Sequence, residues 1–253
     1  MEFFIATLDP ATAILLFSIS FVGSFITVAM GIGGGAIVLA VMATLVPAAA
    51  LIPVHGVIQL GSNVNRALVL GRHTYWPPVL AFGVGSTIGV ALGGLVVIDL
   101  PAAFVQIGIG CFILWSILLT PPHWLTQRPG VTGAISSFLT MFFGATGVFV
   151  SGYVRSMALG REAHVATQAV LMTLQHLLKV TVFAALGFSF GPWLGFMGVM
   201  IATGLLGTLV GRQVLIRMND KIFARVLRLI LGALALRLIW QGVTALVGGV
   251  MLS

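Results

Sequence analysis

The sequence contains few acidic residues and few charged residues of either sign. Asp and Glu number 5 and Lys and Arg number 12 among 253 residues, so charged residues make up 7% of the chain and hydrophobic ones 59%. A soluble domain of this length could not hide so much apolar surface, because its own exterior would have to be apolar too. The composition therefore excludes a soluble enzyme or binding domain and predicts a protein whose exterior contacts the lipid bilayer.

Cysteine is nearly absent as well, since Cys111 is the single one. A single cysteine excludes an internal disulfide and a thiolate metal cluster, and we predict neither a metal nor another cofactor. The sequence also lacks a phosphate-binding loop of the Walker type, so ATP hydrolysis by this chain is not expected.

Apolar runs of the length that crosses a bilayer fill most of the sequence. A helix needs roughly 20 apolar residues to cross a hydrocarbon core of about 30 Å. We predict an all-α polytopic membrane protein with about eight transmembrane segments plus broken or re-entrant helices. The long unalternated runs are unlike the strands of a β-barrel. The runs lie at 12–30, 33–46, 49–70, 76–98, 102–120, 131–152, 162–187, 191–211 and 229–249.

Basic residues predict the orientation of the chain. They gather in a few connections between the runs, whereas residues 1–11, 98–101 and 187–191 contain neither Lys nor Arg. One orientation fits this pattern if each broken run returns to the side on which it starts. By the positive-inside rule we predict a multi-pass protein of the cell inner membrane with cytoplasmic basic loops and both termini outside, in the periplasm. This placement explains the net charge of +7, so no nucleic-acid partner is expected. The basic connections carry Arg72, then Arg128, then Arg155 and Arg161, then Arg212, Arg217, Lys221, Arg225 and Arg228. Residues 213–228 mix Arg with apolar residues, which is typical of a helix on the membrane surface.

The first half of the chain resembles the second half at an offset of 113 positions. Eight residues, among them Gly31 and Gly34, meet identical residues there, and both halves order a glycine-broken run before a polar helix. The predicted topology gives the two halves opposite orientations. We therefore predict one transmembrane domain built from two inverted repeats, residues 1–121 and 122–253. Inverted repeats with interrupted helices are typical of transporters.

Each half contains a glycine-rich break inside an apolar run. Glycine lets the backbone leave the helix, and a half-helix that starts after the break points free N–H groups into the protein. Irregular backbone at membrane depth is tolerated only where it is buried or lines a cavity. We predict that both breaks bind substrate, and tight packing of small residues is the alternative. The predicted residues are Gly31, Gly33, Gly34 and Gly35 in the first break and Gly144, Thr146 and Gly147 in the second.

The helices that follow the breaks carry polar side chains at helical spacing. These are His55, Gln59, Asn63 and Arg66 in the first half, and Gln168, Gln175, His176 and Lys179 in the second. Placing a polar group inside a membrane costs free energy unless the group is paired or hydrated. The two stripes therefore predict a hydrated central site. Because every acidic residue falls at a helix end or in a loop, we predict that this site is electropositive and binds a small anionic substrate. The alternatives are snorkelling of the two cations and simple interhelical hydrogen bonds of the histidines, which could also relay protons.

At these residues the chain resembles the TauE/SafE family of sulfite and organosulfonate exporters. The resemblance rests on the break at 31–35, the turn near Pro47, the loop 71–76 and the segment 159–163. The second break departs from the triple glycine of the first. Membership implies a secondary transporter that exports small sulfur-containing anions such as sulfite or organosulfonates.

Three functions can be compared on the sequence. The favoured one is a carrier that works by alternating access at the central site and is driven by the membrane potential or by protons. An anion channel on the same scaffold stays open. An intramembrane enzyme is disfavoured, because Ser151 and its possible partners His164 and His176 lack a nucleophile-elbow motif. The sequence determines neither the transported anion nor the oligomeric state.

Overall fold

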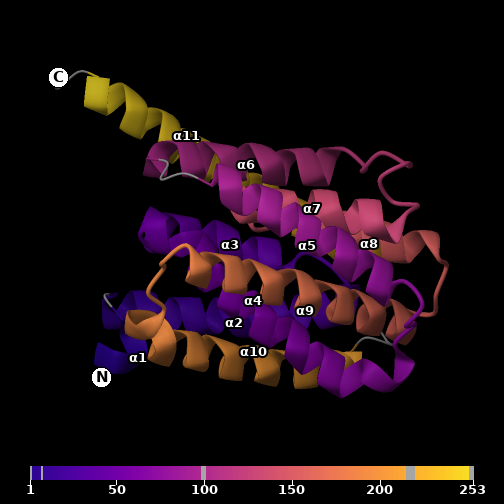
Figure 1. Cartoon of the computed structure of the whole chain (residues 1–253). Coiled ribbons are helices and arrows are strands. Elements are labelled where there is room, and N and C mark those ends of the chain that lie inside the picture. The colour runs from indigo at the N-terminus through magenta and orange to yellow at the C-terminus, as the bar shows by residue number, and fades with distance from the viewer. Residues whose placement is uncertain (1, 7, 98–100, 215–219, 251–253) are drawn as a thin grey trace.

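The computed structural model describes residues 2–6, 8–97, 101–214 and 220–250, and these residues form helices and short connections with no strand (Figure 1). The all-α prediction is confirmed for them. The helices are α1 (Glu2–Ile5), α2 (Pro10–Met30), α3 (Gly34–Leu45), α4 (Ala48–Leu70), η1 (Gly71–His73), α5 (Val79–Val96), α6 (Ala102–Leu118), α7 (Pro129–Phe143), α8 (Gly147–Ser156), α9 (Arg161–Ala185), η2 (Gly191–Trp193), α10 (Leu194–Val214) and α11 (Asp220–Val250).

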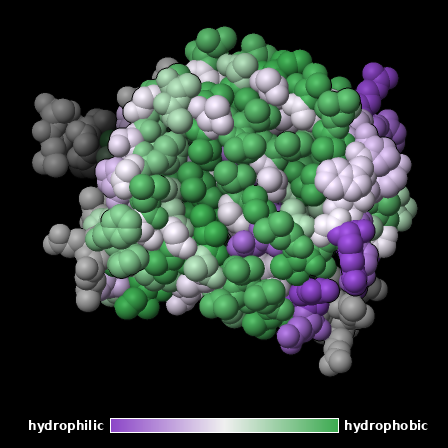
Figure 2. All heavy atoms as spheres, turned by 60° about the horizontal axis from the view of Figure 1, so that its bottom comes forward, coloured by the Kyte–Doolittle hydropathy of each residue, from purple (hydrophilic) through white to green (hydrophobic). Residues whose placement is uncertain are grey.

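Several helices have the length and composition of membrane spans. In the described part of the chain there are 5 such segments, Pro10–Met30, Val79–Val96, Arg161–Ala185, Gly191–Gln213 and Arg225–Val247. The predicted number of crossings stays a prediction. Leu80 and Leu95 of α5 are 79% and 83% exposed, and Figure 2 shows hydrophobic side chains over most of one face. An apolar exterior of this kind is expected where lipid surrounds the protein.

The two glycine breaks interrupt the helices where the sequence predicts. The first lies between α2 and α3, with Gly31 at φ 79° and Gly33 at φ 104°, and the second lies between α7 and α8, with Gly144 at φ 69°. These left-handed values favour glycine. At 12 and 10 residues, α3 and α8 are too short to cross a core of about 30 Å. The helix α3 packs back against α2, and α8 packs against α7.

The main helix pairs each join the first half of the chain to the second. The polar helices α4 and α9 lie side by side in the middle of the bundle, while α2 packs on α10, α5 on α7 and α6 on α11 (Figure 1). The halves are therefore interleaved rather than separate domains. This arrangement brings the two polar stripes together.

The connections that contain basic residues gather at one end of the bundle. In Figure 1, η1 and the connections before α7 and before α9 lie on the right, whereas α1 and the end of α11 lie on the left. Figure 2 keeps the same left and right and shows strongly hydrophilic residues toward the right. We call these the basic end and the opposite end. Arg217 lies outside the described residues.

The surface helix expected over 213–228 lies partly outside the described residues, and its place at the membrane surface stays a prediction. The helix α10 continues to Val214, and α11 runs from Asp220 to Val250 without interruption. Leu227 is buried, and both it and Leu231 line the central cavity. Of the apolar residues in this range whose side chains the structure describes, Leu227 thus faces the protein interior, while Val226 is exposed.

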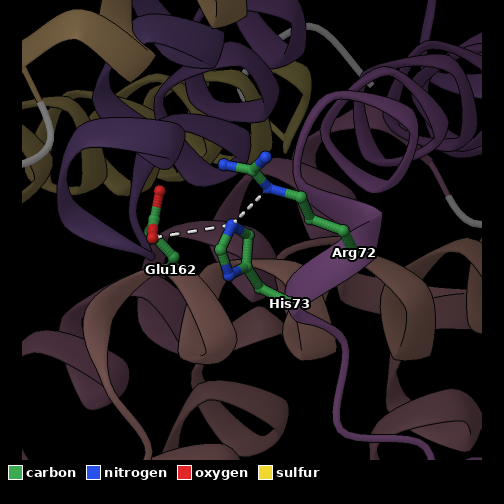
Figure 3. Close-up of polar contacts among 3 residues, drawn as sticks. All are labelled: Arg72, His73 and Glu162. Carbon is green, nitrogen blue, oxygen red and sulfur yellow. Dashed lines mark hydrogen bonds and ion pairs between the residues drawn. The ribbon is translucent and has the colours of Figure 1, made fainter.

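A small polar cluster ties η1 to the start of α9 at the basic end (Figure 3). Arg72 Nε donates to His73 Nε2 at 2.9 Å, and Glu162 Oε2 lies 3.5 Å from the same nitrogen. Glu162 also stands in the first turn of α9, where the helix dipole favours a carboxylate. The cluster connects the two halves beside the mouth of the cavity.

Candidate functional site

A cavity of about 730 Å³ lies between the two breaks and the two polar helices. It extends to the basic end, where the connections at 119–121 and 159–161 border it. Ten of the predicted site residues line its wall, namely Gly33, Gly35, His55, Gln59, Asn63, Arg66, Gly144, Gly147, Gln168 and His176. The structure therefore brings both breaks and both polar stripes to one place.

The half-helices α3 and α8 both begin at the cavity. Gly33 caps α3 and Thr146 caps α8, and neither makes a side-chain capping hydrogen bond. Gly35 in the first turn of α3 and Val148 in the first turn of α8 line the wall. The first N–H groups of a helix have no partner inside the helix, and the helix dipole is positive there. Two such ends at one cavity favour an anion.

Two histidines lie at the cavity between the breaks. His55 Nε2 donates to the carbonyl oxygen of Gly35 at 3.2 Å, and its Nδ1 lies 3.3 Å from the place where a β-carbon on Gly144 would stand. The ring of His176 is 6.5 Å from that of His55, centroid to centroid. Both ring nitrogens of His176 and Nδ1 of His55 lack a hydrogen-bond partner. These nitrogens are therefore buried without a partner beside the cavity.

Arg66 supplies a buried positive charge to the wall. It is only 4% exposed, and its guanidinium donates to Ser62 Oγ at 3.2 Å and to Asn63 Oδ1. Ser62 Oγ in turn lies 2.9 Å from Ser24 Oγ. All these partners are neutral, so the charge of the guanidinium is not compensated by them. This arrangement disagrees with simple snorkelling to the membrane surface, which would leave the charged group in water.

Further basic residues surround the cavity toward the basic end. Arg155 of α8, Arg161 and His164 of α9, and Arg228 of α11 line it there. Sequence reasoning missed them as site residues because the positive-inside rule already explained basic connections. Together with Arg66 they make four arginines, and none of the described residues that line the cavity is Asp or Glu. An enclosed wall with one sign of charge raises the local concentration of the opposite ion.

Five predicted site residues do not line the cavity, namely Gly31, Gly34, Thr146, Gln175 and Lys179. Gly31 ends α2 and Gly34 packs against the backbone of α2 at Gly23. The Gln175 side chain donates to Thr146 Oγ1 at 2.9 Å and accepts from Ser136 Oγ at 2.8 Å. These hydrogen bonds hold the second break against α9. They therefore shape the site from behind its wall.

Lys179 is buried one turn beyond His176 along α9. Its side chain is fully buried against Gly56 of α4, where an added β-carbon would lie 2.7 Å from Lys179 Cε. The ammonium nitrogen has no hydrogen-bond partner. It therefore contributes no direct contact to the cavity in this conformation.

The comparison with known families settles the kind of protein. The family model for sulfite exporter TauE/SafE matches residues 16–238. The chain belongs to the TauE/SafE family. The matched range includes both breaks, both polar helices and the arginines at the cavity, and the suspected resemblance is confirmed. A search of the curated proteins finds no match. TauE/SafE proteins are membrane transporters for sulfite export rather than enzymes.

In this TauE/SafE transporter we expect Arg155→Gln to weaken anion uptake from the basic end mainly at low salt. Arg155 is exposed and lines the cavity, so its field acts on arriving anions over a Debye length of about 10 Å at 0.1 M salt. The apparent KM should rise by about threefold at low salt and converge with wild type at high salt, while kcat stays the same. Initial rates of radiolabelled sulfite uptake at two ionic strengths measure this.

The matched control for that experiment is Arg128→Gln. Arg128 lies at the same end, before α7, and does not line the cavity. If both variants shift KM equally, the effect comes from general surface charge and the steering role of Arg155 is wrong.

Proposed function

We propose that this protein is a secondary transporter that exports small sulfur-containing anions, such as sulfite or organosulfonates, by alternating access. The observation that carries the proposal is the cavity wall, which combines four arginines and two half-helix N-termini with no lining carboxylate among the described residues. A cation would be repelled by this wall and a neutral molecule would gain nothing from it. The choice of a sulfur-containing anion rests on the match to the sulfite exporter family.

The polar groups of the wall suit an oxyanion. A guanidinium and backbone N–H groups bind sulfur or carboxylate oxygens by charge-assisted hydrogen bonds, each stronger than a neutral one. Arg66 offers a charge from α4, the first turns of α3 and α8 offer amides, and the rings of His55 and His176 lie in the same wall. Groups from opposite walls can therefore surround one small anion.

Helix boundaries support the two inverted repeats, 1–121 and 122–253. The ends of α2 and α7 (Met30 and Phe143) are separated by the same 113 positions as the starts of α3 and α8 (Gly34 and Gly147). The starts of α4 and α9 repeat this offset. The packing also follows the repeat, since exchanging each helix for its counterpart turns the α2–α10 pair into the α7–α5 pair. Two halves that can exchange conformations are the basis of alternating access.

The direction of transport follows from the charge at the basic end. The positive-inside rule assigns this end to the cytoplasm, so the cavity faces inward and can take an anion from the cell. The membrane potential then favours outward movement by about 2.3 kcal/mol per charge per 100 mV.

The test is transport by the purified full chain in proteoliposomes under an imposed potential. We expect saturable uptake of radiolabelled sulfite or an organosulfonate, with acceleration when unlabelled anion is present on the other side. Movement of carboxylates or cations without sulfur anions would show that the proposed substrate is wrong. Unsaturable flux without counter-transport would show a channel instead.

A further inference from the structure

We infer that Lys179 forms a second anion-binding site, which takes the same small sulfur oxyanion when the transporter opens toward the opposite end of the bundle. The inference rests on the proposed alternating access. It begins from a buried lysine that the present cavity does not use.

Among the described residues, the surroundings of Lys179 offer its ammonium group neither a hydrogen-bond acceptor nor a counter-charge. Its ammonium nitrogen has no hydrogen-bond partner, its side chain is fully buried, and Gly56 leaves the room that it occupies. The structure gives it no ion pair with any described acidic residue. An unpaired ammonium in the interior is strongly unfavourable, and ionisable groups inside membrane helices usually mark a pathway for substrate or ions.

Lys179 is also the repeat counterpart of Arg66. The two residues lie 113 positions apart on α4 and α9, whose first residues Ala48 and Arg161 have the same offset. Arg66 lines the open cavity and Lys179 is sealed. When two inverted repeats exchange conformations, counterpart residues exchange surroundings. Opening of the opposite end would therefore bring Lys179 to the wall of an open cavity, as Arg66 lines the cavity now.

If the two halves exchange conformations, one cation should lie in a hydrogen-bond network that the other lacks. Arg66 and Lys179 differ in this way. In the first half, Ser24 and Ser62 connect by hydrogen bonds to Arg66. The counterparts of these three residues at the same offset are Ser137, Gln175 and Lys179.

In the second half the corresponding network is not assembled. Ser137 Oγ and Lys179 Nζ are both buried without a partner, and Gln175 bonds to Thr146 and Ser136 instead. One half thus holds its cation in a formed network while the other keeps the same elements apart. Ser137 Oγ and Lys179 Nζ would then lack partners because the second half is in its closed conformation.

The position of Lys179 along α9 places this second site on the way to the opposite end. In the sequence, segments 1–11 and 187–191 at the opposite end contain neither Lys nor Arg. An anion that leaves Arg66 in that direction meets Lys179 as the next cation. The lysine would therefore hold the anion before its release from the opposite end.

The experiment compares Lys179→Met with Arg66→Met in membrane vesicles of both orientations. A charge-assisted hydrogen bond to an oxyanion is worth about tenfold or more in affinity. For radiolabelled sulfite, Lys179→Met should raise KM about tenfold from the opposite end and less than twofold from the basic end. Arg66→Met should show the reverse. Equal effects of Lys179→Met from both ends, or none, would overturn the inference.

Folding of the variant provides a separate readout. Because the ammonium has no partner, Lys179→Met should raise Tm in detergent, by about 3 °C or more. A lower Tm together with equal loss of transport from both ends would assign Lys179 to structure and contradict the second site.

Chemical labelling tests the exposure directly. In a Cys111→Ser background, Lys179→Cys should react with a membrane-impermeant thiol reagent added at the opposite end. Reaction only from the basic end would contradict the inference. If the unmodified protein moves no sulfur anion from either end, the proposed function itself fails, which separates that result from a failure of Lys179.

Discussion

Arg66→Gln should cut the stabilisation of the protein by sulfite in detergent to about half or less. A ligand at about 100 times its Kd stabilises the native state by about 2.7 kcal/mol, and loss of the guanidinium should weaken binding by about ten- to a hundredfold. The reason is that Arg66 is buried in the cavity wall with only neutral partners, so its charge is available to the anion. Thermal unfolding with and without sulfite measures the shift.

Two further variants sharpen this prediction. Arg66→Lys keeps the charge but loses the planar, multidentate geometry, so it should retain part of the shift. Arg225→Gln removes an exposed arginine of α11 that does not line the cavity, and it should leave the shift unchanged. An Arg66→Gln protein that sulfite stabilises as much as wild type would remove Arg66 from the site.

Gly34→Ala should be the most destabilising small change in the first break. A β-carbon at this position would lie 1.7 Å from the carbonyl oxygen of Gly23 and 2.4 Å from Thr27 Oγ1. Backbone cannot yield as a flexible side chain can, so the pair formed by α2 and α3 must separate. We expect a loss of about 3 kcal/mol or more, seen as a large fall in Tm or as failure to recover monodisperse protein.

The control for this change is Gly160→Ala. Gly160 precedes α9 at φ −60°, and an added β-carbon meets no atom within 4 Å. Its effect on stability should be within about 0.5 kcal/mol. Equal Tm values for the two variants would show that α3 does not pack against α2 as described.

Gly34 also shows where the two interpretations of the glycine breaks divide. The sequence favoured substrate binding and kept tight packing as the alternative, and the structure places two of these glycines at the cavity and one in a tight helix contact. Gly33 and Gly35 line the cavity, whereas Gly34 between them faces the backbone of α2. Successive residues at a helix start point in different directions, so one short motif serves packing and cavity together.

The polar stripe on α9 was predicted in its composition but not in its roles. Gln168 and His176 line the cavity, while Gln175 bonds to the second break and Lys179 is sealed against α4. Helical periodicity indicates which side chains share a face, but it does not say which neighbouring helix that face meets. The contribution of α11 to the cavity had no periodic signal either, because it depends on contacts between segments far apart in the chain.

The sequence by itself determined that lipid surrounds this protein, where its helices break and that its net charge is positive. These features follow from composition and local pattern. A helix that crosses the bilayer needs a long apolar run, glycine permits a left-handed backbone, and arginine stays charged. Only the tertiary structure decided that Arg66 lies in an open cavity while Lys179 is buried without a partner. The reason is physical: burial and pairing depend on what the packed helices place beside a residue, and each of these two cations lies on a helix that the fold pairs with a partner from the other half of the chain.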